Sequence, residues 1–481
     1  MKIIISNLIQ IIDPNQDIIN YCKQQLTFKN PDYQKKVQMG FYTGKTPRYI
    51  KLYDYNSSDN SVCVPIGCFE DIFKMVNDKS LYKDYSVVVP RDIKSNIELR
   101  DYQQPCLNAL KQHYNGILLL PCGTGKTECA LQIASFLGQK TLFIAHTNDL
   151  VKQAHDRCLD KMNVKTSMIG DGKVDLSGDI VFATVQTLFK KLDEIPQDTF
   201  GLVVCDECHH IAANADSVGM FRNCIDYFAA RYKLGLTATL HRADGLESCI
   251  PKLLGDIIYE IKEDGSDYIG VYDGKEVIRF PKDKFQVPAK VYMTKTNYSI
   301  VDENNNYRDV FDKNGMTISF SKLITDISCD KERNNLIIKL VKYMSGSTII
   351  LSDRVDQLTY LQSKIPNSVE IDGKTKKDVR EKALEDIKSG KKKVLLASYK
   401  LAKEGLDCKI LQNVVFATPV KDYAIVVQCI GRCQRPYEGK KIARVFDLMD
   451  NVSTLKRFTG KRRNTYKKMN YEYVDFEIGG V

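Results

Sequence analysis

The sequence predicts an α/β protein in which a small α+β domain precedes two doubly wound parallel sheets in tandem. Two stretches, at about residues 97–256 and 330–455, alternate short apolar runs with amphipathic segments of helical period. This alternation is typical of a parallel sheet with helices on both faces. Only the first stretch holds a glycine-spaced turn that ends in Lys-Thr, and residues 1–90 lack the alternation. The chain therefore divides into an accessory domain and two α/β domains.

Composition indicates a globular chain without membrane spans. The 481 residues suffice for about three domains with cores of their own. They are 43% hydrophobic and 27% charged, and no apolar run approaches the ~20 residues of a membrane span. We therefore expect no membrane partner. The apolar run at residues 1–13 is interrupted by Ser6, Asn7 and Gln10, which favours a buried strand over a signal peptide.

Cysteine usage and net charge narrow the class of protein further. The 15 cysteines are scattered without the dense spacing of a secreted scaffold, so we expect a reducing, cytoplasmic location. Cys205 and Cys208 lie beside His209 and His210, but no second ligand pair lies at zinc-like spacing, and structural zinc is not expected. The net charge of +10 favours a polyanionic partner.

The predicted accessory domain, residues 1–90, has strand-like runs at 48–53 and 61–65 and no catalytic motif. Basic and aromatic residues gather between positions 33 and 45, among them Lys35, Lys36, Tyr42 and Lys45. Such a patch is consistent with nucleic-acid contact. The alternative, that the domain is only a stabilising cap, stays open at this point.

The first α/β stretch has five apolar runs that we predict as strands, each followed by a polar cluster. The runs are 116–120, 141–145, 180–183, 202–205 and 234–236, and the clusters are 123–127, 146–148, 184–187, 206–210 and 237–239. Ligands of such sheets bind at the carboxyl ends of the strands, so we expect the clusters to meet in one crevice.

The first of these clusters predicts a phosphate cradle for ATP. Gly123, Thr124 and Gly125 let successive backbone N–H groups face one concavity, and a helix that begins near Lys126 adds its N-terminus. Lys126 would reach the β- and γ-phosphates, and the Thr127 hydroxyl would bind the bridging Mg²⁺. The apolar run at 202–205 ends in Asp206, a second Mg²⁺ ligand, and Glu207, which would activate the attacking water.

The second α/β stretch, residues 330–455, has predicted strands at 348–351, 394–397, 414–417 and 443–446 and no cradle of its own. We predict that residues 257–329 form an insertion and linker between the two α/β stretches. Residues 456–481 predict a basic C-terminal tail that includes Lys461, Arg462 and Arg463. These three residues either follow nucleic-acid phosphates or form a solvated face, because a charge run alone is weak evidence.

Together the motifs resemble a superfamily 2 helicase of the DEAD/DEAH-box type. Residues 121–127 resemble motif I, residues 206–209 (D-E-C-H) resemble motif II, and residues 237–239 resemble motif III. Residues 234–245 are similar to the XPB-like branch and its UvsW-like phage relatives, where Arg-x-Asp follows motif III, here Arg242 and Asp244. Leu240 stands where proline is usual, and Ala243 where XPB has an acid.

The resemblance implies roles for residues in several further motifs. Adenine contacts are implied for Arg100 and Gln103, and strand-phosphate contacts for His146, Thr147, Thr184, Gln186, Thr187 and Arg242. Motif V corresponds to residues 398–407, with Lys400 toward nucleic acid and Gly405 and Asp407 toward ATP. Motif VI corresponds to residues 428–435, with Gln428, Arg432 and Arg435. The two arginines, three apart, should share one helix face and stabilise charge on the γ-phosphate.

The function implied is ATP hydrolysis, by two RecA-like domains, that drives movement on duplex or branched DNA or its remodelling. Contacts to phosphates would make this movement largely independent of sequence. The resemblance favours DNA over RNA as the partner. Three alternatives remain: a motor subunit of a restriction or defence complex, an RNA helicase, and a nucleic-acid-binding scaffold without catalysis.

Overall fold

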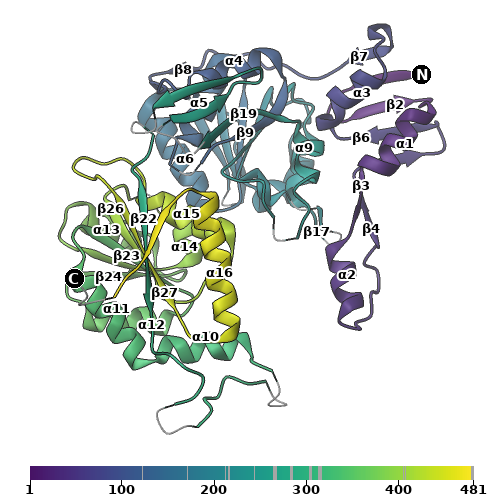
Figure 1. The fold of residues 1–481 in the computed structure, drawn as a ribbon. Helices are drawn as coiled ribbons and strands as arrows, with labels where there is room; N and C mark the ends of the chain where they lie inside the picture. The colour runs from purple at the N-terminus through teal and green to yellow at the C-terminus, as the bar shows by residue number, and fades with distance from the viewer. Residues whose placement is uncertain are drawn as a thin grey trace. The chain divides into compact units, whose positions relative to one another are not determined.

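The computed structural model describes residues 1–121, 123–170, 172–211, 213–214, 217–242, 244–263, 268–281, 285–302, 306–312, 317–404, 406 and 408–477. The chain forms two compact units, the first made of most of residues 1–280 and the second of most of residues 281–477 (Figure 1). No described helix combines the length and the apolar character needed to span a lipid bilayer.

The first unit begins with the predicted α+β domain, which is built on a five-stranded sheet in the order β5-β6-β2-β1-β7. The strands are β1 Lys2–Ile5, β2 Ile9–Ile12, β5 Asp54–Asn56, β6 Ser61–Val64 and β7 Tyr82–Asp84. The helices are α1 Gln16–Gln25 and α3 Phe69–Met75. A separate hairpin of β3 Thr27–Lys29 and β4 Tyr49–Lys51 carries helix α2 Pro31–Gln38. The N-terminal apolar run thus forms two antiparallel strands in which alternate residues are buried.

This domain is fixed to the next one by buried apolar and polar contacts. The Asn7 amide donates to the Asp226 carbonyl at 2.7 Å, and the Lys252 ammonium lies 2.6 Å from an Asp71 carboxylate oxygen. Lys233, fully buried, donates to the carbonyls of Asn7 and Ile225, each at 2.9 Å. The accessory domain therefore has a built interface with the α/β domain that follows it.

The first α/β domain has a ten-stranded sheet in the order β13-β12-β14-β10-β15-β18-β9-β19-β20-β21. Its strands are β9 Asn115–Leu119, β10 Thr141–Ala145, β12 Thr166–Gly170, β13 Lys173–Val174, β14 Ile180–Thr184, β15 Leu202–Asp206, β18 Tyr232–Thr237, β19 Ile257–Glu263, β20 Tyr268–Tyr272 and β21 Val277–Pro281. Its helices include α4 Pro105–Gln112, α5 Lys126–Leu137, α6 Asn148–Lys161, α7 Val185–Phe189, α8 Met220–Tyr227 and α9 Cys249–Leu254. All five predicted strands are present.

The carboxyl ends of the central strands lie at one edge of this sheet. Parallel pairing sets Ala145 opposite Thr184, Asp206 opposite Leu236, and Thr237 opposite Leu119. The polar segments after these strands therefore start at nearly the same level, which the parallel arrangement predicted.

The second unit is a parallel sheet of seven strands in the order β24-β25-β23-β26-β27-β22-β28. The strands are β22 Ala289–Lys295, β23 Ser347–Ser352, β24 Ser368–Ile371, β25 Val394–Ser398, β26 Leu411–Phe416, β27 Ala443–Met449 and β28 Glu472–Asp475. The helices are α10 Phe320–Cys329, α11 Lys331–Tyr343, α12 Val355–Lys364, α13 Lys377–Lys388, α14 Tyr399–Glu404, α15 Tyr423–Cys433 and α16 Ser453–Lys468. Helices α11 and α12 pack on one face, and α13, α15 and α16 on the other.

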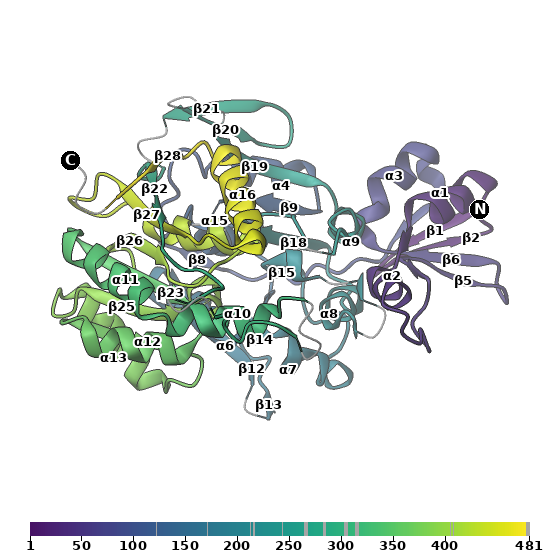
Figure 2. The same ribbon diagram turned by 60° about the horizontal axis from the view of Figure 1, so that its bottom comes forward.

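Two predicted boundaries need correction. The segment 257–329 is not one linker, because β19, β20 and β21 extend the first sheet whereas β22 belongs to the second. The predicted tail at 456–481 is, as far as residue 477, part of the second α/β domain, because α16 packs beside α15 and β27, and β28 pairs with β22 (Figure 2). The sequence carries the reason: Leu455, Phe458 and Tyr466 recur at helical spacing and are buried. The basic residues of α16 other than Arg462 therefore lie away from this buried face.

Candidate active site

The glycine-spaced turn joins β9, which ends at Leu119, to α5, which begins at Lys126. Gly123 and Gly125 have φ of 84° and 86°, in the left-handed region that glycine adopts without strain. A Cβ atom on Gly125 would lie 2.4 Å from the Gln103 amide nitrogen, so a larger residue would also collide there. Helix α5 thus presents its N-terminus at the end of a buried strand, an arrangement that binds anions. Cys122 lies outside the described residues.

Four side chains connect this turn to the ends of the two neighbouring strands. The Lys126 ammonium donates to Glu207 Oε1 at 3.1 Å, and the other Glu207 oxygen lies 3.2 Å from His209 Nδ1. His209 Nδ1 in turn lies 2.9 Å from the Thr237 hydroxyl. Lys126 and Glu207 are only 12% and 15% exposed, so these charges interact in a largely desolvated site.

Glu207 has a backbone φ of 51°, which is rare for a residue with a side chain. Its amide N–H donates to Asp206 Oδ1 at 3.0 Å. The left-handed conformation turns the chain sharply after β15, and consecutive acids thereby reach different partners. Strain of this kind concentrates at functional sites.

The two acids have opposite pKa shifts. Burial, together with the Glu207 charge, raises the pKa of Asp206 to about 6. Burial would also raise the pKa of Glu207, but the Lys126 ammonium and His209 hold it well below its usual range. Glu207 is therefore ionised at neutral pH.

Arg242 lies behind this network rather than on the surface. Its guanidinium donates to both Asp244 oxygens and to the carbonyls of His209 and Ile211, and its side chain is 10% exposed. The Thr237 hydroxyl donates to the Thr239 carbonyl at 2.8 Å and closes the turn between them. The predicted nucleic-acid contact by Arg242 is corrected accordingly: this side chain ties the segment after β18 to the segment after β15.

The two segments predicted to contact strand phosphates, residues 146–147 and 184–187, meet in the same unit. Thr147 is the N-cap of α6 and Thr184 the N-cap of α7, accepting from the amides of Leu150 and Thr187, each at 3.3 Å. The Gln186 amide donates to the His146 carbonyl at 3.1 Å. The Thr184 and Thr187 hydroxyls are also 3.0 Å apart. Two helix N-termini, which attract phosphate, are thus cross-linked.

Histidine rings connect these helix ends to the acid pair. The rings of His146 and His210 have centroids 4.2 Å apart, and so do those of His210 and His209. Sequence reasoning did not assign roles to His209 and Thr237, although the D-E-C-H pattern itself contains the histidine. The sequence did contain a signal for His209. It follows Glu207 by two residues, so a sharp turn of the chain at Glu207 brings the two side chains together.

The residues predicted to contact adenine lie against the cradle. Gln103 is 4% exposed, and its side-chain oxygen accepts from the Arg100 amide at 2.8 Å. The Arg100 guanidinium donates to the Tyr102 hydroxyl at 2.7 Å. Gln103 is therefore held in one orientation directly beside Gly125.

In the second unit, motif VI lies on α15 and just beyond it. Gln428 is 2% exposed, and Arg432 donates to the Leu406 carbonyl at 2.6 Å. Helix α15 ends at Cys433, so the prediction that both arginines share one helix face is corrected: Arg435 lies past the helix end. Lys400 is exposed on α14. Gly405 and Asp407 lie outside the described residues.

Two protein-family models match the two α/β domains in order. Residues 96–242 match the model "Type III restriction enzyme, res subunit", and residues 332–437 match "Helicase conserved C-terminal domain". The first match contains the cradle and the acid pair, and the second contains motif VI.

The chain is a superfamily 2 helicase.

Relatives of this helicase span nearly all of its length. It is 28% identical to "Putative ATP-dependent RNA helicase L396" of Acanthamoeba polyphaga mimivirus, over 90% of this chain and 80% of that protein. It is 27% identical to "DNA 3'-5' translocase XPB2" of Sulfurisphaera tokodaii, over 82% and 92% of the two chains. The resemblance to the XPB-like and UvsW-like group is confirmed, since "ATP-dependent DNA helicase uvsW" of Enterobacteria phage T4 is 25% identical over 74% of this chain and 69% of that protein.

The fold of the helicase is also found among solved structures. A fragment of a putative HsdR subunit of a type I restriction enzyme from Vibrio vulnificus superposes with a TM-score of 0.52 at 21% identity, covering 75% of this chain and 65% of that one. Saccharomyces cerevisiae Dbp5 superposes with the same TM-score at 16% identity, covering 85% and 93%. The predicted pair of RecA-like domains is confirmed. As a member of this enzyme class, the helicase uses ATP and acts on nucleic acid.

The three basic residues predicted to bind nucleic acid near the C-terminus lie differently on α16. Arg462 is 2% exposed; its guanidinium lies 2.7 Å from an Asp447 oxygen and donates to the carbonyls of Val420 and Leu448. Its predicted contact with nucleic acid is corrected, because a buried, paired guanidinium cannot reach phosphates. Lys461 is exposed and Arg463 is half-buried.

Proposed function

We propose that this helicase is an ATP-dependent motor that translocates on DNA and remodels duplex or branched DNA. One observation carries the proposal: an unbroken series of contacts runs from Lys126 through Glu207 and the neighbouring histidine rings to His146 and Gln186. A change in charge at the cradle therefore has a physical route to the helix ends suited to strand phosphates. The names of the relatives XPB2 and uvsW, and the net charge of +10, support DNA as the partner.

The cradle is proposed to hold ATP with Mg²⁺. Its donor set fits a hard cation, since Thr127 supplies a hydroxyl and Asp206 a buried carboxylate, both oxygen ligands. Mg²⁺ bound there would neutralise charge on the phosphates. Lys126 would leave Glu207 for the γ-phosphate, and the released carboxylate would orient and deprotonate the attacking water.

The remaining roles follow the motifs. Arg432 and Arg435 are proposed to stabilise charge that develops on the γ-phosphate, which is worth several powers of ten in rate. Gln103 and Arg100, with Gly405 and Asp407, would contact the nucleotide. Contacts with strand phosphates are proposed for His146, Thr147, Thr184, Gln186, Thr187, Lys400, Lys461 and Arg463.

Displacement of a third strand from duplex DNA tests this function directly. A triplex-forming oligonucleotide on a linear duplex should be released in the presence of ATP and Mg²⁺, and Lys126→Ala should release none. The same protein should convert a model fork into a paired, regressed product. Absence of both activities, in protein that hydrolyses ATP on addition of DNA, would contradict translocation on duplex DNA.

A second function is favoured by the match of residues 96–242 to the restriction-enzyme model. The chain would then be the motor of a restriction or defence complex and would need a partner for full activity. Under this alternative the isolated chain displaces the triplex strand poorly, and a partner subunit restores displacement. Full activity of the isolated chain would exclude it.

A further inference from the structure

The hairpin of β3 and β4 with helix α2, residues 27–51, forms a basic projection on the accessory domain. Figure 1 shows it extending away from the five-stranded sheet. It contains six basic residues and one acid. The basic residues are Lys29, Lys35, Lys36, Lys45, Arg48 and Lys51, and the acid is Asp32. The projection therefore carries a clear excess of positive charge.

Polar contacts, not a core, hold helix α2 on the hairpin. None of its eight residues is buried. Asn30, fully buried, caps the helix through the Asp32 amide at 3.0 Å and donates to the Pro47 carbonyl at 2.8 Å. The Lys36 ammonium donates to the Thr46 hydroxyl at 2.6 Å. The helix is thus fixed in place without using its apolar side chains.

Large apolar side chains of the projection are therefore left at the surface. Val37, Met39 and Phe41 are 54%, 55% and 63% exposed, and Tyr42 is 91% exposed. A contiguous segment of such residues, preceded by Lys35 and Lys36 and followed by Lys45, is typical of a binding surface and not of a stabilising cap.

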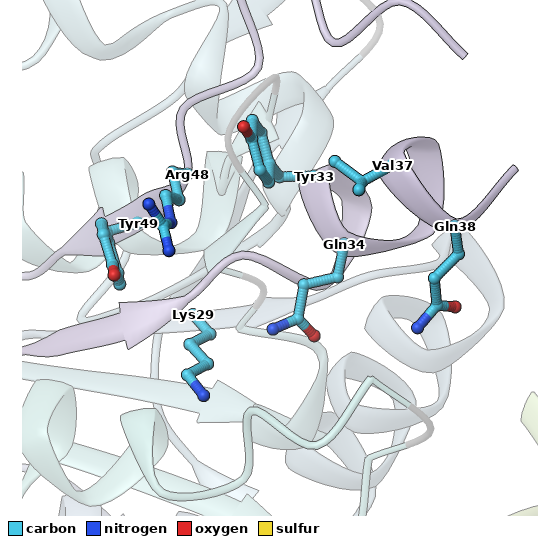
Figure 3. A pocket seen from close by; sticks show the side chains of 7 residues that line it. All are labelled: Lys29, Tyr33, Gln34, Val37, Gln38, Arg48 and Tyr49. Atoms are coloured by element: carbon cyan, nitrogen blue, oxygen red, sulfur yellow. The ribbon is translucent and has the colours of Figure 1, made fainter. Parts of the chain in front are cut away.

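Between α2 and the two strands lies a groove of about 520 Å³ (Figure 3). Its lining combines two tyrosines, two amides and two cations: Tyr33, Tyr49, Gln34, Gln38, Lys29 and Arg48. The Arg48 guanidinium lies 5.4 Å from the centre of the Tyr49 ring, a cation–π distance. Tyrosine rings stack on bases, amides bond to base edges, and cations hold phosphates.

We infer that the basic projection binds single-stranded nucleic acid, with bases stacked on Tyr33 and Tyr49 and the backbone held by Lys29 and Arg48. Paired bases in a duplex are not available to stack on these rings, and the groove has room for a nucleotide or two but not for a double helix. The inference rests on the proposed function only in that both concern nucleic acid. The basic projection would add a nucleic-acid-binding site outside the two RecA-like domains.

Binding measured without ATP tests the inference independently of hydrolysis. The probes are fluorescein-labelled oligo(dT) and oligo(U) of twelve nucleotides and a twelve-base-pair duplex, titrated with full-length protein and followed by anisotropy. The double variant Tyr33→Ala/Tyr49→Ala should bind the single strands about tenfold more weakly or worse, and the duplex within about twofold of wild type. Loss on one single-stranded probe alone would support the site and show that it distinguishes oligo(dT) from oligo(U).

Two matched variants separate stacking from misfolding. Tyr33→Phe/Tyr49→Phe keeps both rings and should retain wild-type affinity, and Tyr85→Ala, an exposed tyrosine elsewhere on the same domain, should do the same. Lys29→Glu/Arg48→Glu should weaken binding and make the dependence of log affinity on log salt concentration less steep, by the equivalent of about 1 to 2 phosphate contacts. Lys83→Glu should change neither the affinity nor this salt dependence. Unchanged single-strand affinity in the alanine variant, or an equal loss on the duplex, would overturn the inference.

Discussion

The Lys126 ammonium lies 3.1 Å from a Glu207 carboxylate oxygen, so the proposed phosphate-binding cation and the proposed general base are directly paired. Both are largely buried, and the Lys126 ammonium lowers the pKa of Glu207 and holds it in its charged form. An anion that attracts Lys126 must therefore separate the pair. Breaking the Lys126–Glu207 ion pair would then free Glu207 to act as the base.

This pairing predicts the effect of Glu207→Gln. The amide keeps the shape of the side chain but cannot accept a proton, so ATP turnover should fall at least about 100-fold while ATP still binds. Steady-state hydrolysis and titration with a fluorescent ATP analogue would measure the two effects. Glu194→Gln, at an exposed ion pair, is the matched control and should leave both unchanged. Turnover near that of wild type in Glu207→Gln would remove Glu207 from the mechanism.

Arg242→Ala should destabilise the first unit rather than weaken binding to nucleic acid. The change leaves Asp244 and two backbone carbonyls without their donor, which costs about 1–3 kcal/mol in the free energy of unfolding. Urea unfolding measures this cost, and Arg242→Lys should show an intermediate value because lysine cannot form the paired contact. Unchanged stability of Arg242→Ala, together with a lower salt-dependent affinity for DNA, would instead support the phosphate contact predicted for Arg242.

Alanine substitutions at the neighbouring residues Arg462 and Lys461 of α16 should differ strongly in their effect on stability. Arg462→Ala leaves the fully buried Asp447 uncompensated and should lower the free energy of unfolding of the second unit by about 3–5 kcal/mol. Lys461→Ala, one residue earlier and exposed, should change it by less than about 0.5 kcal/mol. Equal stabilities of the two variants would show that the Arg462–Asp447 pair contributes little.

Lys233 should make stability depend on alkaline pH. Burial lowers its pKa from 10.5 to about 8, although Asp226 opposes the shift. Between these two values the unfolded chain binds more protons than the folded one, so the free energy of unfolding should rise with pH across that window, by roughly 3 kcal/mol in total. Urea unfolding at pH 7.5 and 10 measures the rise, and Lys233→Met should abolish this component. The same pH dependence in both proteins would contradict the assignment.

The parallel sheets could be predicted because each strand is a short apolar run that ends in polar residues, as at β15 and Asp206. The end of α15 could also have been predicted. Pro436 follows Arg435 and disfavours helical geometry there, so Arg432 and Arg435 do not share a helix face.

Other features depend on contacts that no local pattern contains. Arg462 looks like its basic neighbours in the sequence, although its spacing from Phe458 and Tyr466 places it on the buried face of α16. Its partner Asp447, fifteen residues away on β27, is found only in the folded structure. Arg242 likewise takes its role from the carbonyls of the segment after β15. The sequence shows which residues are charged, but long-range packing decides whether a charge faces solvent or a partner.

Steady-state ATP hydrolysis tests whether the cradle at Lys126 powers work on DNA. Wild type and Lys126→Ala would be compared without nucleic acid and with single-stranded DNA, duplex DNA, forked DNA and RNA. We expect strong stimulation of the wild type by DNA, more than by RNA, and no stimulated hydrolysis in Lys126→Ala. Folded wild-type protein that binds ATP but is stimulated by none of these nucleic acids would contradict this expectation.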